Sequence, residues 1–402
     1  MLEIVFLRTP VLGESLLFIV LIPSVLERER TSSIIFFMES TQTICFDADW
    51  TLVKYKLKEF VQLCYQDMVT KIAQKGYDSA ILQHPSSESP ENHVVSGLVA
   101  DLQTGFLLKL DKNYQVLKAY QGFEEVSRKT LQETYGIPSV FELSNPQNIY
   151  VKGAYFVFVA NFCLGLQLAF RVGVQRIKEG ALHTSYASYM HEALEVFATI
   201  LEDQNCGFYK EVVAKPANYV IQQPELVPLL RNLRSSGKKL GVITNSPGVY
   251  AKVILKQTLG EDWEELFDFV VVDSCKPSFF LETPEFCESE GFLQYGNWES
   301  LQLQKELGST MYVGDHYLGD IYAPKLKGLK VTGIFEEVYR ELGLEGVVSK
   351  ELTSNTGAEY ETEWGSIIGP HGEGLWWNWV IRYSDLVSTS VKELLSYLTS
   401  AS

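Results

Sequence analysis

The chain has 402 residues, of which 46% are hydrophobic and 21% charged, and its net charge is −16. This size and composition are typical of a globular protein with a large core and about two domains, and they exclude a disordered chain. The acidic balance argues against a nucleic acid as partner, because binding a phosphate backbone requires a basic surface. A small phosphorylated substrate stays open, since a metal ion and a few local cations suffice to bind it.

The N-terminal residues 1–40 are expected to be an extension, because Met38 stands just before the first motif and is the expected natural start. The apolar run 16–22 resembles the core of a signal peptide but is too short to span a bilayer. The six cysteines are scattered, with no Cys-x-x-Cys pair, which favours free thiols in a reducing compartment. We therefore expect a cytoplasmic protein, with a membrane-anchored protein as an alternative that rests on residues 16–22 alone.

The first strand expected after this extension is an apolar run that ends in Asp47-Ala48-Asp49-Trp50-Thr51. Two carboxylates one residue apart at a strand end repel each other unless a cation or a proton lies between them. Metal-assisted phosphoryl transfer uses such a pair. A solvated turn after a strand is the alternative explanation for this motif taken alone.

A long segment, residues 57–220, follows this strand. Its helical and alternating patterns predict, in chain order, a helix (57–74), a β-hairpin (105–120), a helix (123–135), a buried strand (155–159) and two helices (ending near 177, and 183–201). About 190 residues separate Asp49 from Thr244, far more than one crossover connection needs. We therefore expect an inserted domain here.

Aromatic residues of this inserted segment have two interpretations. They could stack on a purine base, although packing in the core is the better explanation for Phe156, Phe158, Tyr186 and Tyr189.

From residue 224 onward, short apolar strands alternate with helices. The expected elements are a helix (226–235), a strand (within 238–246), a helix (248–258), a strand (267–273), a helix (297–307), two strands (310–315 and 330–334) and a helix (336–342). Apolar strands that alternate with helices indicate a parallel sheet covered on both faces, so the fold class is α/β with a Rossmann-like sheet. Ligands of such sheets bind beyond the carboxyl ends of the strands.

Polar residues follow four of these strands. They are Asp47, Asp49 and Thr51; Thr244 and Asn245; Lys276; and Asp315 and Asp320. Phosphoryl transfer needs a nucleophile, an acid/base, a phosphate clamp, a cation and metal-binding carboxylates, and this set supplies each of them. We expect these side chains to meet at one edge of the sheet.

These motifs resemble the four motifs of the haloacid dehalogenase (HAD) superfamily. More narrowly, the segments 46–55, 244–246, 276–280 and 314–321 are similar to the 5′-nucleotidase domain-containing proteins, relatives of cytosolic purine 5′-nucleotidase. The resemblance runs from about Thr43 to Glu337. It implies a HAD catalytic core (41–56 and 221–345), an α+β cap domain that selects the substrate (57–220) and a C-terminal tail (346–402).

The resemblance also implies catalytic roles. Asp47 is the nucleophile that forms an aspartyl-phosphate. Asp49 is the acid/base that protonates the leaving nucleoside oxygen and then activates water. Lys276 offsets charge on the phosphoryl group and on Asp47. The implied phosphate-binding residues are Thr51, Thr244, Asn245 and Lys276.

The implied cofactor is Mg²⁺, which prefers a hard site made of oxygen atoms. Asp47 and Asp315 bind it through their carboxylates, and Asp49 through its backbone carbonyl. Asp320 steadies either Lys276 or the outer ligands of the metal.

We therefore expect a Mg²⁺-dependent 5′-nucleotidase of nucleotide metabolism. Alternatives are a phosphatase for another small phosphate ester, and a binding or scaffold protein that keeps the fold with little turnover. Relatives of the purine enzyme carry an Asp-Val-Arg-like element where this chain has Tyr189-Met190-His191-Glu192, so the resemblance does not extend to purine specificity.

The tail is expected to end in an amphipathic helix at 385–399. Its apolar face is expected to dock on the catalytic core, and a contact between two copies in a homo-oligomer is the alternative.

Overall fold

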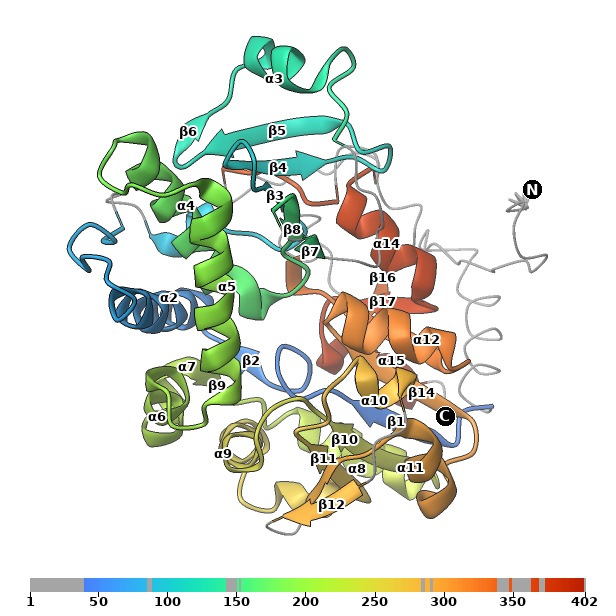
Figure 1. Ribbon diagram of the computed structural model, residues 1–402. Helices are drawn as coiled ribbons and strands as arrows, with labels where there is room; N and C mark the ends of the chain where they lie inside the picture. Colours follow the sequence, from blue (N-terminus) through green and yellow to red (C-terminus); the bar gives the residue numbers. More distant parts are fainter. Residues whose placement is uncertain are drawn as a thin grey trace, which may run out of the picture.

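The computed structural model describes residues 40–84, 89–141, 150–151, 153–282, 286–289, 292–337, 347–348, 363–368 and 373–400. The expected N-terminal extension and most of the helix expected at 336–342 lie outside the described residues. Figure 1 shows a parallel sheet in the lower half of the molecule and a smaller sheet above it.

The larger sheet has nine strands in the order β12-β13-β11-β10-β1-β14-β15-β17-β16. Their bounds are β1 (Thr43–Phe46), β10 (Lys239–Ile243), β11 (Phe269–Val272), β12 (Phe286–Ser289), β13 (Phe292–Tyr295), β14 (Thr310–Gly314), β15 (Lys330–Ile334), β16 (Val347–Val348) and β17 (Leu386–Ser388). All neighbours from β13 to β17 pair in parallel, and β12 and β16 pair antiparallel at the two edges. The expected parallel α/β sheet is thereby confirmed.

Helices cover both faces of this sheet. Side chains of one strand point alternately to the two faces, so Ile44 and Phe46 join one buried cluster and Cys45 another. The helices that pack on the first face are α8 (Leu226–Ser235), α9 (Gly248–Leu259) and α15 (Val391–Ser400), and those on the second are α10 (Ser278–Leu281), α11 (Trp298–Lys305) and α12 (Ala323–Leu326). Burial on both sides explains why the strands read as continuous apolar runs.

The inserted segment leaves and re-enters the core through one short ladder. Strand β2 (Lys54–Tyr55) pairs antiparallel with β9 (Val220–Ile221), so the two connections to the core run side by side. The helices between them are α2 (Leu57–Ala73), α3 (Arg128–Tyr135), α4 (Leu164–Lys178), α5 (Tyr186–Glu202), α6 (Gly207–Ala214) and α7 (Pro216–Tyr219). Short 3-10 helices lie at Pro90–His93 and Asn161–Cys163.

A six-stranded antiparallel sheet lies within the same segment, in the order β6-β5-β4-β3-β8-β7. Its strands are β3 (Val99–Asp101), β4 (Phe106–Leu110), β5 (Val116–Gln121), β6 (Glu124–Glu125), β7 (Tyr150–Val151) and β8 (Tyr155–Val157). The predicted hairpin is confirmed as β4 and β5. The helix predicted at 123–135 is wrong at its start, because residues 124–125 pair with β5 and the helix begins at Arg128 after the Ser127 cap.

The aromatic residues of the inserted segment pack mainly in the core, as expected. Phe156, Phe158 and Tyr189 are buried, whereas Tyr186 is partly buried and packs against the same core.

The C-terminal tail is part of the parallel sheet. The helix predicted at 385–399 is wrong before residue 391, because Leu386–Ser388 forms β17 beside β15. Asp385 begins this pairing: its amide donates to the Val331 carbonyl, and its carboxylate accepts from the Val331 amide. Four apolar residues of α15 are then fully buried on the core, which confirms the docked tail: Val391, Leu394, Leu395 and Leu398.

A second tail helix, α14 (Leu375–Tyr383), lies between the antiparallel sheet and α12 (Figure 1). Its Leu375 and Trp379 share a buried cluster with Val99 and Leu108 of that sheet. Trp379 also stacks on Tyr317 with ring centroids 5.4 Å apart. The tail therefore connects the inserted segment to the core.

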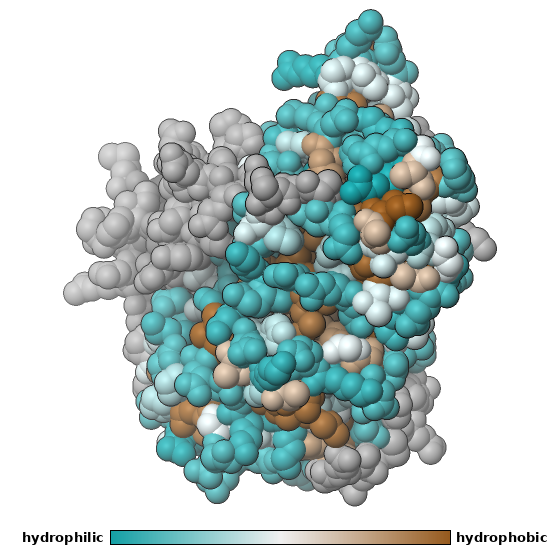
Figure 2. Space-filling view, turned by 90° about the vertical axis from the view of Figure 1, so that its left-hand side faces the viewer, coloured by the Kyte–Doolittle hydropathy of each residue, from teal (hydrophilic) through white to brown (hydrophobic). Residues whose placement is uncertain are grey.

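The surface is mostly polar on the face drawn in Figure 2, where hydrophobic residues form small separate patches. Among the described residues, no helix combines the length and apolar character needed to cross a membrane.

Candidate active site

The candidate site lies at the carboxyl edge of the parallel sheet, where three central strands end together. Phe46, the last residue of β1, is in register with Val242 of β10 and Val313 of β14. Asp47 therefore emerges opposite Ile243 and Gly314, the residues just before Thr244 and Asp315, and its amide continues the ladder by donating to the Val313 carbonyl at 2.8 Å. Residues far apart in the sequence thus meet because their strands are neighbours.

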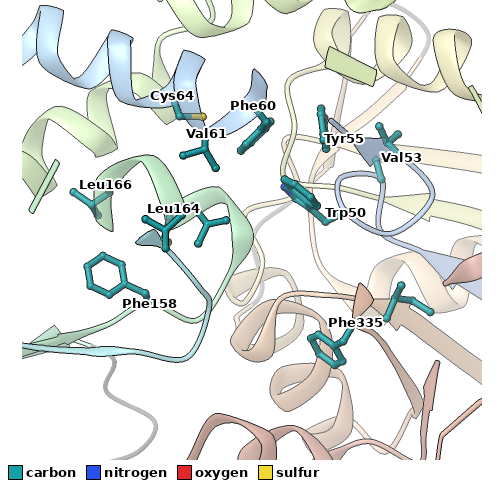
Figure 3. Packing of buried hydrophobic residues seen from close by; sticks show 14 of the residues in the cluster. Trp50, Val53, Tyr55, Phe60, Val61, Cys64, Phe158, Leu164, Leu166 and Phe335 are labelled. Atoms are coloured by element: carbon teal, nitrogen blue, oxygen red, sulfur yellow. The ribbon is translucent and has the colours of Figure 1, made fainter. Parts of the chain in front are cut away.

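A tight turn follows β1 and sets the directions of its two carboxylates. The Val53 amide donates to the Ala48 carbonyl at 2.9 Å, and Trp50 has φ = 54°, in the left-handed region. The Trp50 ring packs against Tyr55 and Phe60, with ring centroids 5.1 and 5.0 Å away (Figure 3). This packing stabilises a backbone conformation that is unfavourable for a residue with a large side chain.

Lys276 is the central cation of the site, and its side chain is only 2% exposed. The ammonium lies 2.9 Å from Asp47 Oδ1 and 2.6 Å from Asp320 Oδ1. It also donates to the Tyr312 hydroxyl at 2.8 Å, which in turn donates to the Ile243 carbonyl. Burial lowers the pKa of Lys276, but Asp320 and Asp47 raise it by more, so the net shift is upward and the ammonium stays charged.

The loop that carries Lys276 is fixed by the side chain of Asn245. The Asn245 amide group donates to the Lys276 carbonyl at 2.9 Å, and its oxygen accepts from the Lys276 amide at 2.6 Å and from Ser274 Oγ at 2.9 Å. Asp273 and Cys275 in this loop have φ angles of 48° and 56°, which lie in the left-handed region. The structure therefore gives the Asn245 side chain a positioning role for Lys276.

A π-helical turn at Tyr317–Tyr322 contains Asp320 and begins two residues after Asp315. The turn needs glycine at position 314, because an added Cβ would lie 2.4 Å from the Asp320 Cβ. His316 caps it by accepting from the Gly319 amide through Nδ1 at 3.1 Å. Burial, followed by the nearby Lys276 charge, lowers the pKa of His316 to about 4, so its ring is neutral.

Three buried carboxylates of this site fit a divalent cation. Asp47, Asp315 and Asp320 each offer an oxygen, and these oxygens all lie within 4.8 Å of one another. Burial raises the pKa of Asp47 to about 7, and the Asp320 charge adds to this shift while Lys276 opposes it. Burial and the charges of Asp320 and Asp47 raise the pKa of Asp315 well above its ordinary value. Such mutual repulsion among oxygen donors favours a hard cation such as Mg²⁺.

Asp49 lies outside this group of three. Its Oδ2 accepts from Ser246 Oγ at 2.5 Å, and its Oδ1 accepts from the Tyr55 hydroxyl. Burial and the Asp47 charge raise the pKa of Asp49 to about 6, although Ser246 and Tyr55 oppose the shift. A carboxyl group with this pKa can both donate and accept a proton near neutral pH.

The two threonines expected to bind phosphate are both buried at the site. Thr244 Oγ1 accepts from the Ser246 amide at 3.1 Å, which leaves its hydroxyl hydrogen as a donor. Thr51 Oγ1 is buried without a hydrogen-bond partner.

Four site residues were absent from the sequence prediction: Tyr55, Ser246, Tyr312 and His316. Ser246 and His316 lie inside the motif segments 244–246 and 314–321, so their positions could have pointed to them. Tyr312 lies in an apolar strand, and its only signal is a hydroxyl group in a segment that is otherwise buried. Tyr55 ends the motif segment 46–55, but its role could not be predicted, because the turn that folds it back onto Asp49 is not visible in a sequence pattern.

Comparisons with known proteins relate the chain to one family. The model of the 5′ nucleotidase family matches residues 35–347. The chain is similar to 5′-nucleotidase domain-containing protein 1 of Bos taurus, with 28% identity over 324 residues that cover 71% of this chain and 70% of that protein. It is also similar to 5′-nucleotidase domain-containing protein 2 of Homo sapiens, with 25% identity over 414 residues (88% and 78%). The solved structure of an archaeal β-phosphoglucomutase from Pyrococcus sp. strain ST 04 aligns with a TM-score of 0.33 and 14% identity, covering 73% of this chain and 86% of that chain.

Proposed function

The chain belongs to the 5′ nucleotidase family, and we propose that it is a Mg²⁺-dependent phosphatase that hydrolyses a nucleoside 5′-monophosphate through an aspartyl-phosphate. The family match bears out the resemblance to the 5′-nucleotidase domain-containing proteins and assigns the chain to the phosphoric monoester hydrolases. One observation carries the proposed reaction: the Lys276 ammonium lies between Asp47 and Asp320, and Asp315 lies beside them. This arrangement would supply a nucleophile, a cation and metal ligands at one edge of the sheet.

The three carboxylates of Asp47, Asp315 and Asp320 are the proposed metal ligands. Their donor set consists of oxygen atoms, and their close spacing makes a cation favourable there. A bound Mg²⁺ would polarise the phosphoryl group and shield its charge from the carboxylates. Asp320 also accepts from Lys276 and from the His316 amide, so it holds the lysine in addition to facing the metal position.

Asp47 is the proposed nucleophile, and the structure suggests which of its oxygens attacks. Oδ1 accepts from the Ala48 amide at 2.8 Å and from Lys276 at 2.9 Å. Because Oδ1 already accepts these two hydrogen bonds, Oδ2 has more lone-pair density available and would form the bond to phosphorus. The bond from phosphorus to the nucleoside oxygen breaks, its electron pair stays on that oxygen, and Asp49 supplies the proton.

Hydrolysis of the aspartyl-phosphate reverses the role of Asp49. A water molecule attacks phosphorus, its proton passes to Asp49, and the bond to Asp47 breaks with its electron pair returning to the carboxylate. The Thr244 hydroxyl and Lys276 would donate to phosphoryl oxygens during both steps. The enzyme is left with Asp47 ionised and Asp49 protonated, as it began.

The inserted segment is proposed to act as a cap that selects the leaving group, because its two ends leave the core directly beside the site at β2 and β9. We also propose a cytoplasmic location. The cysteines at 45, 64, 163, 206 and 275 are free, as expected for a reducing compartment.

Replacement of the nucleophile tests the proposed reaction. The purified protein is incubated with Mg²⁺ and a panel of nucleoside monophosphates and sugar phosphates, and phosphate release is measured. We expect turnover by the unchanged protein and none by Asp47→Asn. The matched control is Asp111→Asn, which changes a buried aspartate just after β4 whose oxygen accepts from the Asn113 and Gln115 amides. Equal release by Asp47→Asn would contradict the proposal, as would saturable binding by the unchanged protein without any turnover.

A further inference from the structure

Both oxygens of the proposed acid/base Asp49 are occupied by hydroxyl groups of the protein. Ser246 donates to Oδ2 at 2.5 Å, and Tyr55 donates to Oδ1. The Tyr250 hydroxyl lies 2.9 Å from the Tyr55 oxygen. Because the single hydrogen of Tyr55 is directed at Asp49, Tyr250 must be the donor in that contact. A chain of hydrogen bonds therefore runs from Tyr250 through Tyr55 to Asp49.

Tyr55 is held rigidly at the base of the inserted segment. It lies on β2, which pairs with β9, and only 2% of the residue is exposed. Its ring packs against Trp50 and Phe60, with centroids 5.1 and 4.8 Å away, and Figure 3 shows the three rings close together. The hydroxyl therefore cannot move away from Asp49 without disrupting this packing.

Tyr250 is fixed in the same way from the other side. It lies on α9, and its ring packs against Tyr209 of α6 at 4.8 Å and Phe208 at 5.9 Å. The two tyrosine hydroxyls thus come from separate elements, β2 and α9, and meet behind the Asp49 carboxyl group. Tyr250 thus supports the Tyr55 hydroxyl, which in turn holds the Asp49 oxygen, and each hydroxyl polarises the next.

On the basis of the proposed function, we propose that Tyr55 is a positioning residue for Asp49. Its hydroxyl occupies Oδ1 and fixes the rotation of the carboxyl group. The proton is then transferred by Oδ2, whose partner Ser246 can also accept a hydrogen bond. In the first step the Oδ2–H bond breaks and the proton joins the electron pair released onto the leaving oxygen. In the second step Oδ2 takes a proton from the attacking water. Ser246, beside Oδ2, can donate to it when Asp49 is ionised and accept from it when Asp49 is protonated.

This role affects substrates according to their leaving groups. The alkoxide of a nucleoside is a poor leaving group and needs the proton from Asp49, whereas p-nitrophenolate departs without protonation. Loss of the Tyr55 hydroxyl should therefore slow phosphoryl transfer from a nucleoside monophosphate and leave transfer from p-nitrophenyl phosphate nearly unchanged. A hydroxyl that only stabilises the fold would affect both substrates equally.

The test is a single-turnover experiment with enzyme in excess, so that only the first chemical step is observed. Release of nucleoside is followed with the nucleoside monophosphate that turns over fastest in the panel, and release of p-nitrophenolate with p-nitrophenyl phosphate. For Tyr55→Phe we expect about a 10- to 100-fold slower nucleoside release, which corresponds to losing a hydrogen bond to a charged group. The rate of p-nitrophenolate release by the same variant should change by less than about twofold.

Two further variants separate positioning from packing. Tyr250→Phe removes the donor behind Tyr55. It should slow nucleoside release by a smaller factor than Tyr55→Phe does and leave p-nitrophenolate release unchanged. Tyr209→Phe is the matched control, since Tyr209 is a buried tyrosine of the same aromatic cluster whose hydroxyl donates to the Leu201 carbonyl. It should leave both rates unchanged. Thermal unfolding of each variant shows whether the fold is retained.

Each outcome decides the matter. A rate of Tyr55→Phe that falls with the nucleotide alone supports the inference. Equal falls in rate with both substrates, or no fall with either, overturn it. If the unchanged protein turns over neither substrate, the proposed function itself fails and the inference fails with it. If it turns over both while Tyr55→Phe matches it, the proposed function stands and only the role of Tyr55 is wrong.

Discussion

Replacing Lys276 with methionine is expected to destabilise the protein strongly, because one ammonium stands against three buried carboxylates. Asp47, Asp315 and Asp320 are each at most 8% exposed, and the lysine lies 2.9 and 2.6 Å from two of them. Methionine has a similar length and fills the same space, but it leaves this negative charge without its partner. Removing one member of a buried ion pair costs about 3–5 kcal/mol of unfolding free energy. We expect that loss at pH 8, together with loss of phosphatase activity.

The pH dependence of this loss distinguishes charge from packing. The pKa of Asp47 is already about 7 because burial and Asp320 outweigh the Lys276 charge, so removing that charge raises it further. At pH 6 the carboxyl group can take up a proton and relieve the repulsion. The cost of Lys276→Met should therefore be smaller at pH 6 than at pH 8.

The assay is urea-induced unfolding of metal-free protein at both pH values. The matched control is Lys325→Met, whose lysine pairs with Asp385 at 2.5 Å but is 29% exposed. Partly exposed pairs of this kind contribute about 0–1 kcal/mol, so the control should lose little stability at either pH. The reasoning is refuted if Lys276→Met loses no more than this control, or if its loss is the same at pH 6 and pH 8.

Two other predictions concern Asp49 and Gly314. The pKa of Asp49 is raised from 3.8 to about 6, so the folded chain binds this proton more tightly than the unfolded chain. Stability from this group is therefore present below pH 4 and falls by about 3 kcal/mol as pH rises through 6. Urea unfolding in EDTA should show this decline. Asp49→Asn should remove the share of the decline that comes from Asp49. An unchanged slope in Asp49→Asn would contradict the assignment. Gly314→Ala should lower stability by about 1–3 kcal/mol and impair activity, because its Cβ would lie 2.4 Å from the Asp320 Cβ. Gly248→Ala, whose Cβ would meet nothing nearer than 3.5 Å, is the control, and equal melting temperatures for the two variants would count against a tight fit at position 314.

The parallel sheet could be predicted from the sequence because its strands are buried on both faces. Ile44-Cys45-Phe46 and Phe269–Val272 read as continuous apolar runs, and polar residues begin where each strand ends. The position of the site follows from the same fact, since parallel strands bring their carboxyl ends to one edge.

The strand at Leu386–Ser388 could not be predicted in the same way. Val387 also fits the apolar face of a helix that continues through Leu398, so the pattern alone favours one long helix. Pairing with β15 decides the matter, because Asp385 exchanges hydrogen bonds with Val331, and these contacts span residues that lie far apart in the sequence. Tertiary contacts of this kind override local preference.

The roles of Asn245 and Tyr55 were beyond prediction for a related reason. A strand-end asparagine could either bind phosphate or hold a loop, and only the fold shows that its amide is occupied by the backbone of Lys276. Tyr55 reaches Asp49 because the turn at Trp50 reverses the chain, and a positive φ at a tryptophan is not what the sequence favours. Both residues act through geometry, so their residue types reveal little.

The charges of the site explain why the proposed reaction needs all of its parts at once. Asp47, Asp49, Asp315 and Asp320 are buried near the ammonium of Lys276, and a phosphate ester would bring further negative charge into the same space. The charge of Lys276 cannot balance four carboxylates and a phosphate ester. Substrate binding would therefore favour a divalent cation at the three clustered carboxylates and a proton on Asp49. Burial and the Asp47 charge raise the pKa of Asp49, and this raised pKa would suit the proposed transfer of a proton to the leaving oxygen. We infer that metal affinity and acid catalysis have a common physical origin in this protein, namely an excess of buried negative charge at the end of β1.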